Sequence, residues 1–352
     1  MSPVFLIVAG NLNMNDGSAP HMSVVLVTPD RFDKIRKTMQ HLQAQTVRDH
    51  LEIVIVAPSF ETLELDASEL SVFCQFQVIE VGEIKSTGRA IAAGVQQATA
   101  PVVAYAEEHS YPEPTWAEAL INAHCRAWAA VGAAIANANP GNLISWASLF
   151  TDFGPWVEPA KAGEASFLAW HHTAYKRSVL LDYNSKLDDM LETEGILHRD
   201  LRARGHRLYL EPAAKAYHVN VSRPFSYIGA QFHGGRMFGA ARARHGNWTL
   251  FRRLLYTGSL PLIPLLRLLR VLREIRRSGR QRELLPRAVP VLIIGLVAHA
   301  IGEVTGYALG AGDAAQRRVS FELNRCRHIT EQDRQAGCKA ISPVSPLKAD
   351  RT

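Results

Sequence analysis

Short apolar runs alternate with helix-like segments over residues 22–217, and this alternation limits the choice of fold more than any other feature. Apolar strand-like runs occur at 23–27, 51–57 and 101–106, and an alanine-rich helical segment at 89–98 precedes the last of them. This order is typical of a mainly parallel α/β sheet covered by helices on both faces. Ligands bind such sheets at the carboxyl ends of the strands. Polar residues directly after these runs are therefore candidate site residues.

Two carboxylates and an imidazole end the run at 101–106. They are Glu107, Glu108 and His109, and a Pro-x-Pro break and Trp116 follow. Polar groups at the end of a buried strand must be solvated, paired or bound to a cation. Glu107 and His109 alternate with Glu108, so they point to the same side of an extended chain. Two such ligands can hold a divalent metal and leave positions open for a diphosphate. The segment favours nucleotide-sugar chemistry, and a solvated strand end is the alternative.

Composition excludes several classes of protein. The chain has 352 residues, of which 47% are hydrophobic, so it is not globally disordered. Its net charge is +6, with arginines concentrated between Arg242 and Arg287, which favours a local anionic surface as partner. The basic cluster is mixed with leucines rather than stacking aromatics, so no nucleic-acid partner is expected. The four cysteines show no CxxC or pairing pattern and indicate a reduced, cytoplasmic environment: Cys74, Cys125, Cys326 and Cys338.

A basic, leucine-rich stretch follows the α/β region. Residues 254–266 are uncharged and broken by two prolines, and arginines then recur at near-helical spacing between leucines: Arg267, Arg270, Arg273, Arg276 and Arg277. A helix with this pattern suits the surface of an anionic bilayer. A solvated helix that packs on its own domain is the alternative.

Residues 288–312 carry a single formal charge, Glu303. The length is sufficient to cross a bilayer, but His299, Glu303 and several glycines are unusual for a transmembrane helix. Small residues fall four apart and predict close packing against another helix: Ala298, Gly302, Gly306 and Gly310. Membrane association is expected, and the choice between insertion and a buried or interfacial helix pair stays open.

Five segments together resemble the inverting family 2 glycosyltransferases. Residues 23–45 resemble the family's first strand and helix, and 51–59 its second strand. Residues 89–109 resemble the alanine- and glycine-rich helix with the strand that carries the metal motif. The segment 112–116 matches a Pro-x-Pro-x-Trp continuation, and 194–218 resembles the acidic residue and the terminal Tyr-His. The resemblance implies a GT-A-type nucleotide-diphospho-sugar transferase fold over residues 22 to 220.

The resemblance also implies roles for individual residues. Glu107 and His109 stand at the two aspartates of the Asp-x-Asp metal motif, and His218 stands where the family often places a histidine near the metal. The cofactor is then a divalent metal, Mn²⁺ or Mg²⁺, and histidine favours Mn²⁺ or a later metal. Glu194 stands at the base that deprotonates the acceptor hydroxyl. Glu192, two residues away, is the alternative base.

The donor nucleotide is assigned to residues near the first strand and the metal motif. The resemblance places Thr28, Asp30 and Arg31 in the first nucleotide-binding turn, and Arg89, Glu107 and Glu108 complete the expected donor contacts. The family usually has two aspartates after the second strand, where this chain has Ala57 and Pro58. Base recognition therefore has to come from other residues (Asp30, Glu83 or Arg89), and the nucleobase and the sugar stay open.

Four regions are expected: an N-terminal segment at 1–21, a catalytic domain at 22–235, a helical membrane-associated region at 236–312 and a polar tail at 313–352. The predicted function is a membrane-associated, metal-dependent inverting glycosyltransferase of the hexosyl type. It moves a sugar from a nucleotide-diphosphate donor to a lipid-linked or growing glycan in cell-surface polysaccharide or glycolipid synthesis. The alternative is a catalytically degenerate family member that binds nucleotide-sugar or glycan as a membrane scaffold.

The expected partners are the nucleotide-sugar donor, the lipid-linked or glycan acceptor and an anionic membrane surface, with homo-oligomer formation left open. The expected location is the cytoplasmic side of the inner membrane. Attachment is either peripheral or through one weak transmembrane helix.

Overall fold

A computed structural model describes residues 6–10, 19–169, 171–258 and 260–340. Within these residues ten strands form one sheet in the order β1-β4-β3-β2-β5-β9-β7-β10-β6, with β8 paired to β10. The strands are β1 Leu6–Gly10, β2 Met22–Val27, β3 Leu51–Ala57, β4 Gln75–Glu80, β5 Val102–Ala106, β6 Ser110–Pro112, β7 Ala130–Asn137, β8 Gly163–Ala165, β9 Thr173–Lys176 and β10 Leu208–His218.

The central strands are parallel, and their sequences explain why. Every residue of β2 and β3 is buried, as expected for strands covered on both faces. Side chains alternate between the faces: Val24 and Leu26 enter one core, and Val25 and Val27 enter the other. β9 runs antiparallel between β5 and β7, so β7 and β10 again run in the direction of β2 to β5.

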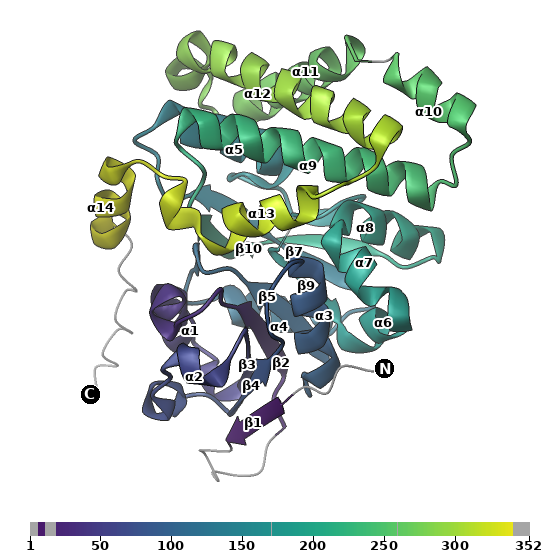
Figure 1. Ribbon diagram of the computed structural model, residues 1–352. Coiled ribbons are helices and arrows are strands. Elements are labelled where there is room, and N and C mark those ends of the chain that lie inside the picture. Colours follow the sequence, from purple (N-terminus) through teal and green to yellow (C-terminus); the bar gives the residue numbers. More distant parts are fainter. Residues whose placement is uncertain (1–5, 11–18, 170, 259, 341–352) are drawn as a thin grey trace.

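Helices cover both faces of this sheet (Figure 1). One core packs Met39 of α1 and Leu120 of α4 against the sheet, and the opposite core packs Val95 of α3 and Leu197 of α8. The helices of this part are α1 Arg36–Gln43, α2 Phe60–Leu63, α3 Thr87–Gln97, α4 Trp116–His124, α5 Leu143–Phe153, α6 Arg177–Leu181, α7 Leu187–Glu192 and α8 Glu194–Ala203. Short 3-10 helices connect them: η1 Phe32–Lys34, η2 Arg48–His50, η3 Ala67–Leu70, η4 Gly154–Trp156 and η5 Asn184–Lys186.

The C-terminal helices form a layer at one end of the molecule (Figure 1). The layer contains α9 Pro224–His245, α10 Leu250–Thr257, α11 Leu262–Arg277 and α12 Gln281–Leu309. α13 Ala314–Leu323, the 3-10 helix η6 Arg325–Arg327 and α14 Glu331–Ala340 follow it in the chain. α12 is the one described helix long and apolar enough by itself to cross a membrane, and 44% of its most apolar window is buried. α10 and α11 meet the same test only as one bent pair.

Close packing of α12 against a second helix is confirmed, and the partner is α9. A Cβ atom on Gly302 would lie 2.0 Å from the carbonyl oxygen of Phe232, and one on Gly306 would lie 2.2 Å from that of Arg236. The two backbones therefore touch at these glycines. Gly310 takes no part, because a Cβ atom there would have nothing within 4 Å.

The expected region limits stay predictions, and the structure shows which elements lie at them. The limit between 235 and 236 falls inside α9, so the catalytic domain and the helical region share one continuous helix. After residue 312, α13 and η6 lie between the helical layer and the sheet (Figure 1). The expected segment at 1–21 contributes β1, which pairs antiparallel with β4, and its residues 1–5 and 11–18 lie outside the described part of the chain.

Candidate active site

Strand directions bring four distant histidines to one edge of the sheet. Glu107 directly follows β5, and His218 is the last residue of β10. His171 and His172 precede β9, and because β9 is antiparallel its amino end lies at the edge where β5 and β10 end. His109 is carried to the same place by β6, which pairs antiparallel with β10.

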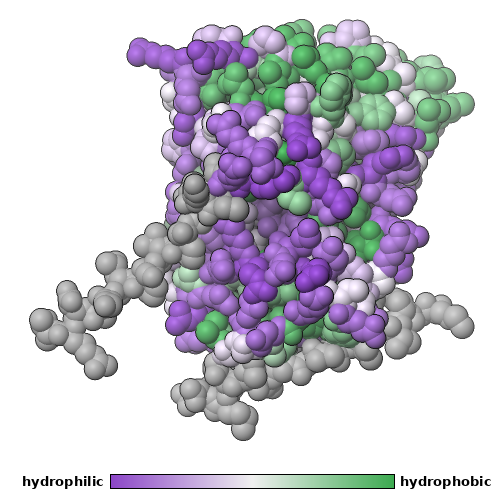
Figure 2. All heavy atoms as spheres, turned by 60° about the vertical axis from the view of Figure 1, so that its left-hand side comes forward, coloured by the Kyte–Doolittle hydropathy of each residue, from purple (hydrophilic) through white to green (hydrophobic). Residues whose placement is uncertain are grey.

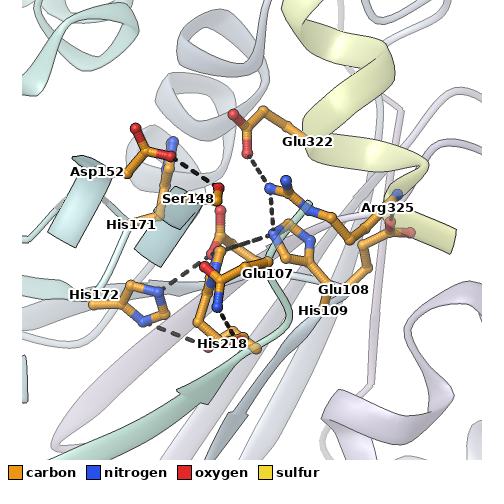
Figure 3. Close-up of polar contacts among 12 residues, drawn as sticks. Glu107, Glu108, His109, Ser148, Asp152, His171, His172, His218, Glu322 and Arg325 are labelled. Carbon is orange, nitrogen blue, oxygen red and sulfur yellow. Dashed lines mark hydrogen bonds and ion pairs between the residues drawn. The ribbon is translucent and has the colours of Figure 1, made fainter. Parts of the chain in front are cut away.

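The three residues expected at the metal come together at this edge (Figure 3). Ligand atoms of Glu107, His109 and His218 all lie within 4.8 Å of one another. Glu107 Oε2 lies 3.7 Å from His109 Nε2, 3.5 Å from His218 Nε2 and 3.3 Å from His172 Nε2, and it has no hydrogen-bond partner. His172 was not expected at the metal.

Neighbouring groups determine which imidazole nitrogens carry protons. His218 Nδ1 lies 2.9 Å from Asn220 Oδ1, which can only accept, so Nδ1 carries the hydrogen and Nε2 is bare. His109 Nε2 lies 2.8 Å from Nη2 of Arg325, which can only donate, so His109 Nε2 is bare as well. The two bare nitrogens lie 3.2 Å apart and face the carboxylate of Glu107.

The protonation states suit metal binding. Burial alone would raise the pKa of Glu107, but the surrounding imidazoles hold it well below its usual value. Burial, together with the nearby Arg325, lowers the pKa of His109 well below its usual value, and burial lowers that of His218 to about 3. An ionised carboxylate and two neutral imidazoles are the forms that bind metals. A carboxylate oxygen and two imidazole nitrogens that carry no proton and face one another fit a divalent cation, although Arg325 now donates to one of them, His109 Nε2.

A cavity of about 210 Å³ opens beside this cluster. Its floor includes Glu107 and His218, and its walls come from α5, α9, α11, α12, α13 and η6. Three carboxylates and three arginines line it: Glu107, Asp152, Glu322, Arg267, Arg318 and Arg325. Burial raises the pKa of Asp152, although Gln231 donates a hydrogen bond to its carboxylate. This cavity connects the metal cluster with the helical layer.

Five of these charged residues were not expected from the sequence. Asp152 lies between the recognised motifs at 112–116 and 194–218, and Arg267 was expected on a basic membrane-surface helix; neither position indicates the cavity. Arg318, Glu322 and Arg325 do have a local signal, because spacings of four and three residues place them on one side of a helix. That signal gives no partner, and their position over the strand ends depends on the path of α12 and α13.

Glu194, the expected base, lies on the other side of His171. It is buried, and its carboxylate accepts hydrogen bonds from Tyr105 at 2.8 Å, from Tyr175 at 3.2 Å and from the main-chain N–H of His171 at 2.8 Å. It does not line the cavity. The alternative base, Glu192, accepts hydrogen bonds from the Ser86 hydroxyl and the Gly88 N–H at the start of α3, and it does not line the cavity either.

Apart from Glu107, the residues expected at the nucleotide lie outside the cavity. The buried Thr28 donates to the carbonyl oxygen of Arg31, whose guanidinium pairs with Glu64 at the surface, and Asp30 accepts from the Arg31 N–H. Arg89 is exposed in the first turn of α3. Glu108 is buried and accepts a hydrogen bond from the N–H of Arg325 at 2.8 Å, and burial raises its pKa to about 7.

Comparison with known proteins identifies the class and then the family. Residues 23–183 match the family model of glycosyl transferase family 2. The mostly parallel sheet with helices on both faces is a GT-A-type fold, as expected. The matched region, a little under half of the chain, is therefore a region of glycosyl transferase family 2, and the chain is a glycosyltransferase.

Two solved structures resemble most of the chain more distantly. One is the mannosyltransferase PcManGT from Pyrobaculum calidifontis in complex with GDP-Man and Mn²⁺, with 14% identity over 86% of this chain and 87% of that chain and a TM-score of 0.47. The other is S. aureus TarS 1–349, with 14% identity over 81% of this chain and 90% of that chain and a TM-score of 0.44. None of the curated proteins matches the chain in sequence.

Proposed function

We propose that this chain is a membrane-associated, metal-dependent inverting glycosyltransferase. It transfers a sugar from a nucleotide-diphosphate donor to a lipid-linked or growing glycan in the synthesis of a cell-surface polysaccharide or glycolipid. The observation that carries the proposal is the meeting of the Glu107 carboxylate with the bare Nε2 atoms of His109 and His218 beside a charged cavity.

Glu107, His109 and His218 would hold the metal, and His172 Nε2, which has no hydrogen-bond partner, lies within reach as a further donor. A bound divalent cation would neutralise charge that develops on the leaving diphosphate. A neighbouring residue orients one of these ligands, because Asn220 Oδ1 accepts a hydrogen bond from His218 Nδ1 and so fixes the imidazole ring. Manganese suits one carboxylate and two imidazoles better than magnesium.

Two carboxylates are candidates for the base that takes the acceptor proton. The resemblance to the family assigns this role to Glu194. Tyr105 and Tyr175, which donate hydrogen bonds to its carboxylate, would have to move before Glu194 could contact an acceptor hydroxyl. Asp152 is the second candidate, because it already lines the cavity and its raised pKa moves it toward the range of an efficient base at neutral pH. Inversion needs only one such base on the face opposite the leaving group.

The nucleoside is proposed to bind along the carboxyl ends of β2 and β3, where Thr28, Asp30 and Arg31 lie, with Arg89 and Glu108 completing the donor site. The Arg31–Glu64 ion pair is exposed, so it can exchange for contacts with a ribose or a base at little cost.

The helical layer supports attachment to a membrane. Hydrophobic residues gather at the end of the molecule formed by α10 to α12 (Figure 2). Those more than a third exposed include Leu250, Phe251, Leu254, Leu255, Leu262, Leu265, Leu266, Leu269, Ile293, Ile294, Val297 and Ile301. Exposed apolar patches of this kind are rare on soluble monomers.

The arginines support an anionic bilayer, although fewer of them face outward than the spacing suggests. Arg270, Arg273 and Arg276 are exposed on α11. Arg267 instead lines the cavity, and Arg277 donates to main-chain oxygens of η4, including that of Gly154. Because one side of α12 is buried against α9, we propose peripheral attachment, with the helices lying in the interface on the cytoplasmic side.

A transfer assay tests the function. The purified protein is incubated with vesicles carrying lipid-linked acceptors and a panel of nucleotide-sugars, and nucleoside diphosphate release is measured with Mn²⁺, with Mg²⁺ and with a chelator. We expect release with one donor class, dependent on metal and acceptor, and a product of inverted anomeric configuration by NMR. Nucleotide binding without transfer under any condition would favour the scaffold alternative.

The same assay separates the two candidate bases. Glu194→Gln and Asp152→Asn are compared at equal folded concentration, judged by circular dichroism. The variant that lacks the base loses kcat with little change in KM for the donor, because the proton is taken only in the transition state.

A further inference from the structure

We propose that Arg325, carried by the C-terminal segment, binds the diphosphate of the donor and leaves His109 when the metal binds. The inference rests on the proposed function and adds to it a residue far outside the matched segment 23–183. Arg325 is only 7% exposed. A buried guanidinium needs anionic or polar partners, because its charge is otherwise costly in the protein interior.

The present contacts of Arg325 leave part of its donor capacity unused. Nη2 lies 2.8 Å from His109 Nε2 and 3.2 Å from Glu322 Oε2. Its Nε, which is also a donor, is buried and has no hydrogen-bond partner. Arg325 also lines the cavity together with Glu107. A guanidinium with a free donor in a cavity beside the metal cluster suits an anion with several oxygens, such as a diphosphate.

The metal and Arg325 compete for the same atom. His109 Nε2 has one lone pair, which Arg325 now occupies. A metal bound to that nitrogen would need the same lone pair, so the guanidinium would have to leave. A diphosphate bound there would offer the freed guanidinium further anionic oxygens beside those of Glu322.

Only the side chain has to move, because the backbone around Arg325 is fixed. The Arg325 N–H donates to Glu108. Three residues further on, the carbonyl oxygen of His328 accepts from the main-chain N–H groups of Ser222 and Arg223 at 3.1 and 3.2 Å. These contacts tie η6 to the chain directly after β10.

The charges of the cavity agree with this assignment. Its three arginines are balanced by its three carboxylates. A divalent metal would add two positive charges, and the diphosphate of the donor would compensate them. Figure 3 shows Arg325 and Glu322 reaching toward Glu107 and His109 from α13 and the turn after it.

Calorimetric titration of the full chain with nucleoside diphosphates, at saturating Mn²⁺, tests the proposal. Arg325→Gln should weaken binding of the nucleotide that the wild type binds by about 10- to 100-fold, the range for a hydrogen bond to a charged group. Arg325→Lys, which keeps the charge but loses the planar fork, should lie in between. The matched control is Arg327→Gln, which removes the same charge two residues away at an exposed position and should bind like the wild type.

Mn²⁺ affinity without nucleotide, measured by electron paramagnetic resonance, separates this role from a structural one. Arg325→Gln should bind Mn²⁺ at least as tightly as the wild type, because a competing cation is gone. Loss of both Mn²⁺ and nucleotide binding would mean a structural role and overturn the proposal, as would unchanged nucleotide affinity or an equal loss in Arg327→Gln. If the wild type binds no nucleoside diphosphate, the proposed function itself fails.

Discussion

Removal of one exposed aromatic side chain should weaken membrane binding by a predictable amount. Phe251 on α10 is 77% exposed, so most of its apolar area is free to enter a bilayer. Full burial of a phenylalanine contributes about 1.5–3 kcal/mol, and the exposed three quarters therefore correspond to about 1–2 kcal/mol. Phe251→Ala should lower the partition coefficient about 5- to 30-fold. The folded protein should keep its stability, because the side chain packs little in water.

The assay is co-sedimentation with vesicles that contain an anionic phospholipid. Leu255, one helical turn along and 63% exposed, gives a second step: the double variant Phe251→Ala/Leu255→Ala should bind more weakly than either single variant. The control is Phe167→Ala, which removes an aromatic side chain that is 45% exposed outside the helical layer. Equal binding of Phe251→Ala and wild type, or an equal loss in Phe167→Ala, would refute the membrane face.

Three further predictions concern the site and the stability of the fold. Glu107→Gln should lower the Mn²⁺ affinity measured by electron paramagnetic resonance at least about 100-fold, because loss of a residue that only orients a metal ligand already costs 10- to 100-fold. Unchanged affinity would show that Glu107 does not bind the metal. Burial lowers the pKa of His124 from 6.5 to about 4. Between pH 7 and pH 5 the free energy of unfolding of the wild type should therefore fall by about 2 kcal/mol more than that of His124→Gln. Equal losses of the two proteins in urea titrations would contradict this. Gly302→Ala should destabilise the fold by about 3 kcal/mol, because the added Cβ atom meets a carbonyl oxygen of α9. Gly195→Ala should leave the stability unchanged, because no heavy atom lies within 4 Å of the added Cβ atom. Equal melting temperatures of the two variants would show that α9 and α12 can separate.

The sheet and the family could be predicted because their signals are local. The apolar runs of β2, β3 and β5 are continuous in the sequence, and burial on both faces follows from parallel pairing. Glu107 follows the run of β5 and His218 ends β10, so their convergence follows from strand direction, and the pairing of β6 with β10 adds His109. Their roles at a metal and a diphosphate stay predictions.

The cavity walls formed by the C-terminal helices could not be predicted, because they depend on contacts between distant segments. Arg325 lies 216 residues after His109, and its N–H bond to Glu108 and the contacts of His328 with the chain after β10 hold it there. The position of Asp152 in the cavity depends on α5 packing beneath the same helices. For Glu194 the sequence predicts a role but not its surroundings. Its place in the motif indicates a base, but nothing in the sequence indicates that the hydroxyls of Tyr105 and Tyr175 bind its carboxylate.

Calorimetric titration with a panel of nucleoside diphosphates, with and without Mn²⁺, tests the central claim most directly. The account predicts that one nucleotide binds the detergent-solubilised protein, and that binding disappears without the metal and in His109→Ala. Binding that survives both metal removal and His109→Ala, or no binding of any nucleotide by folded protein, would contradict it.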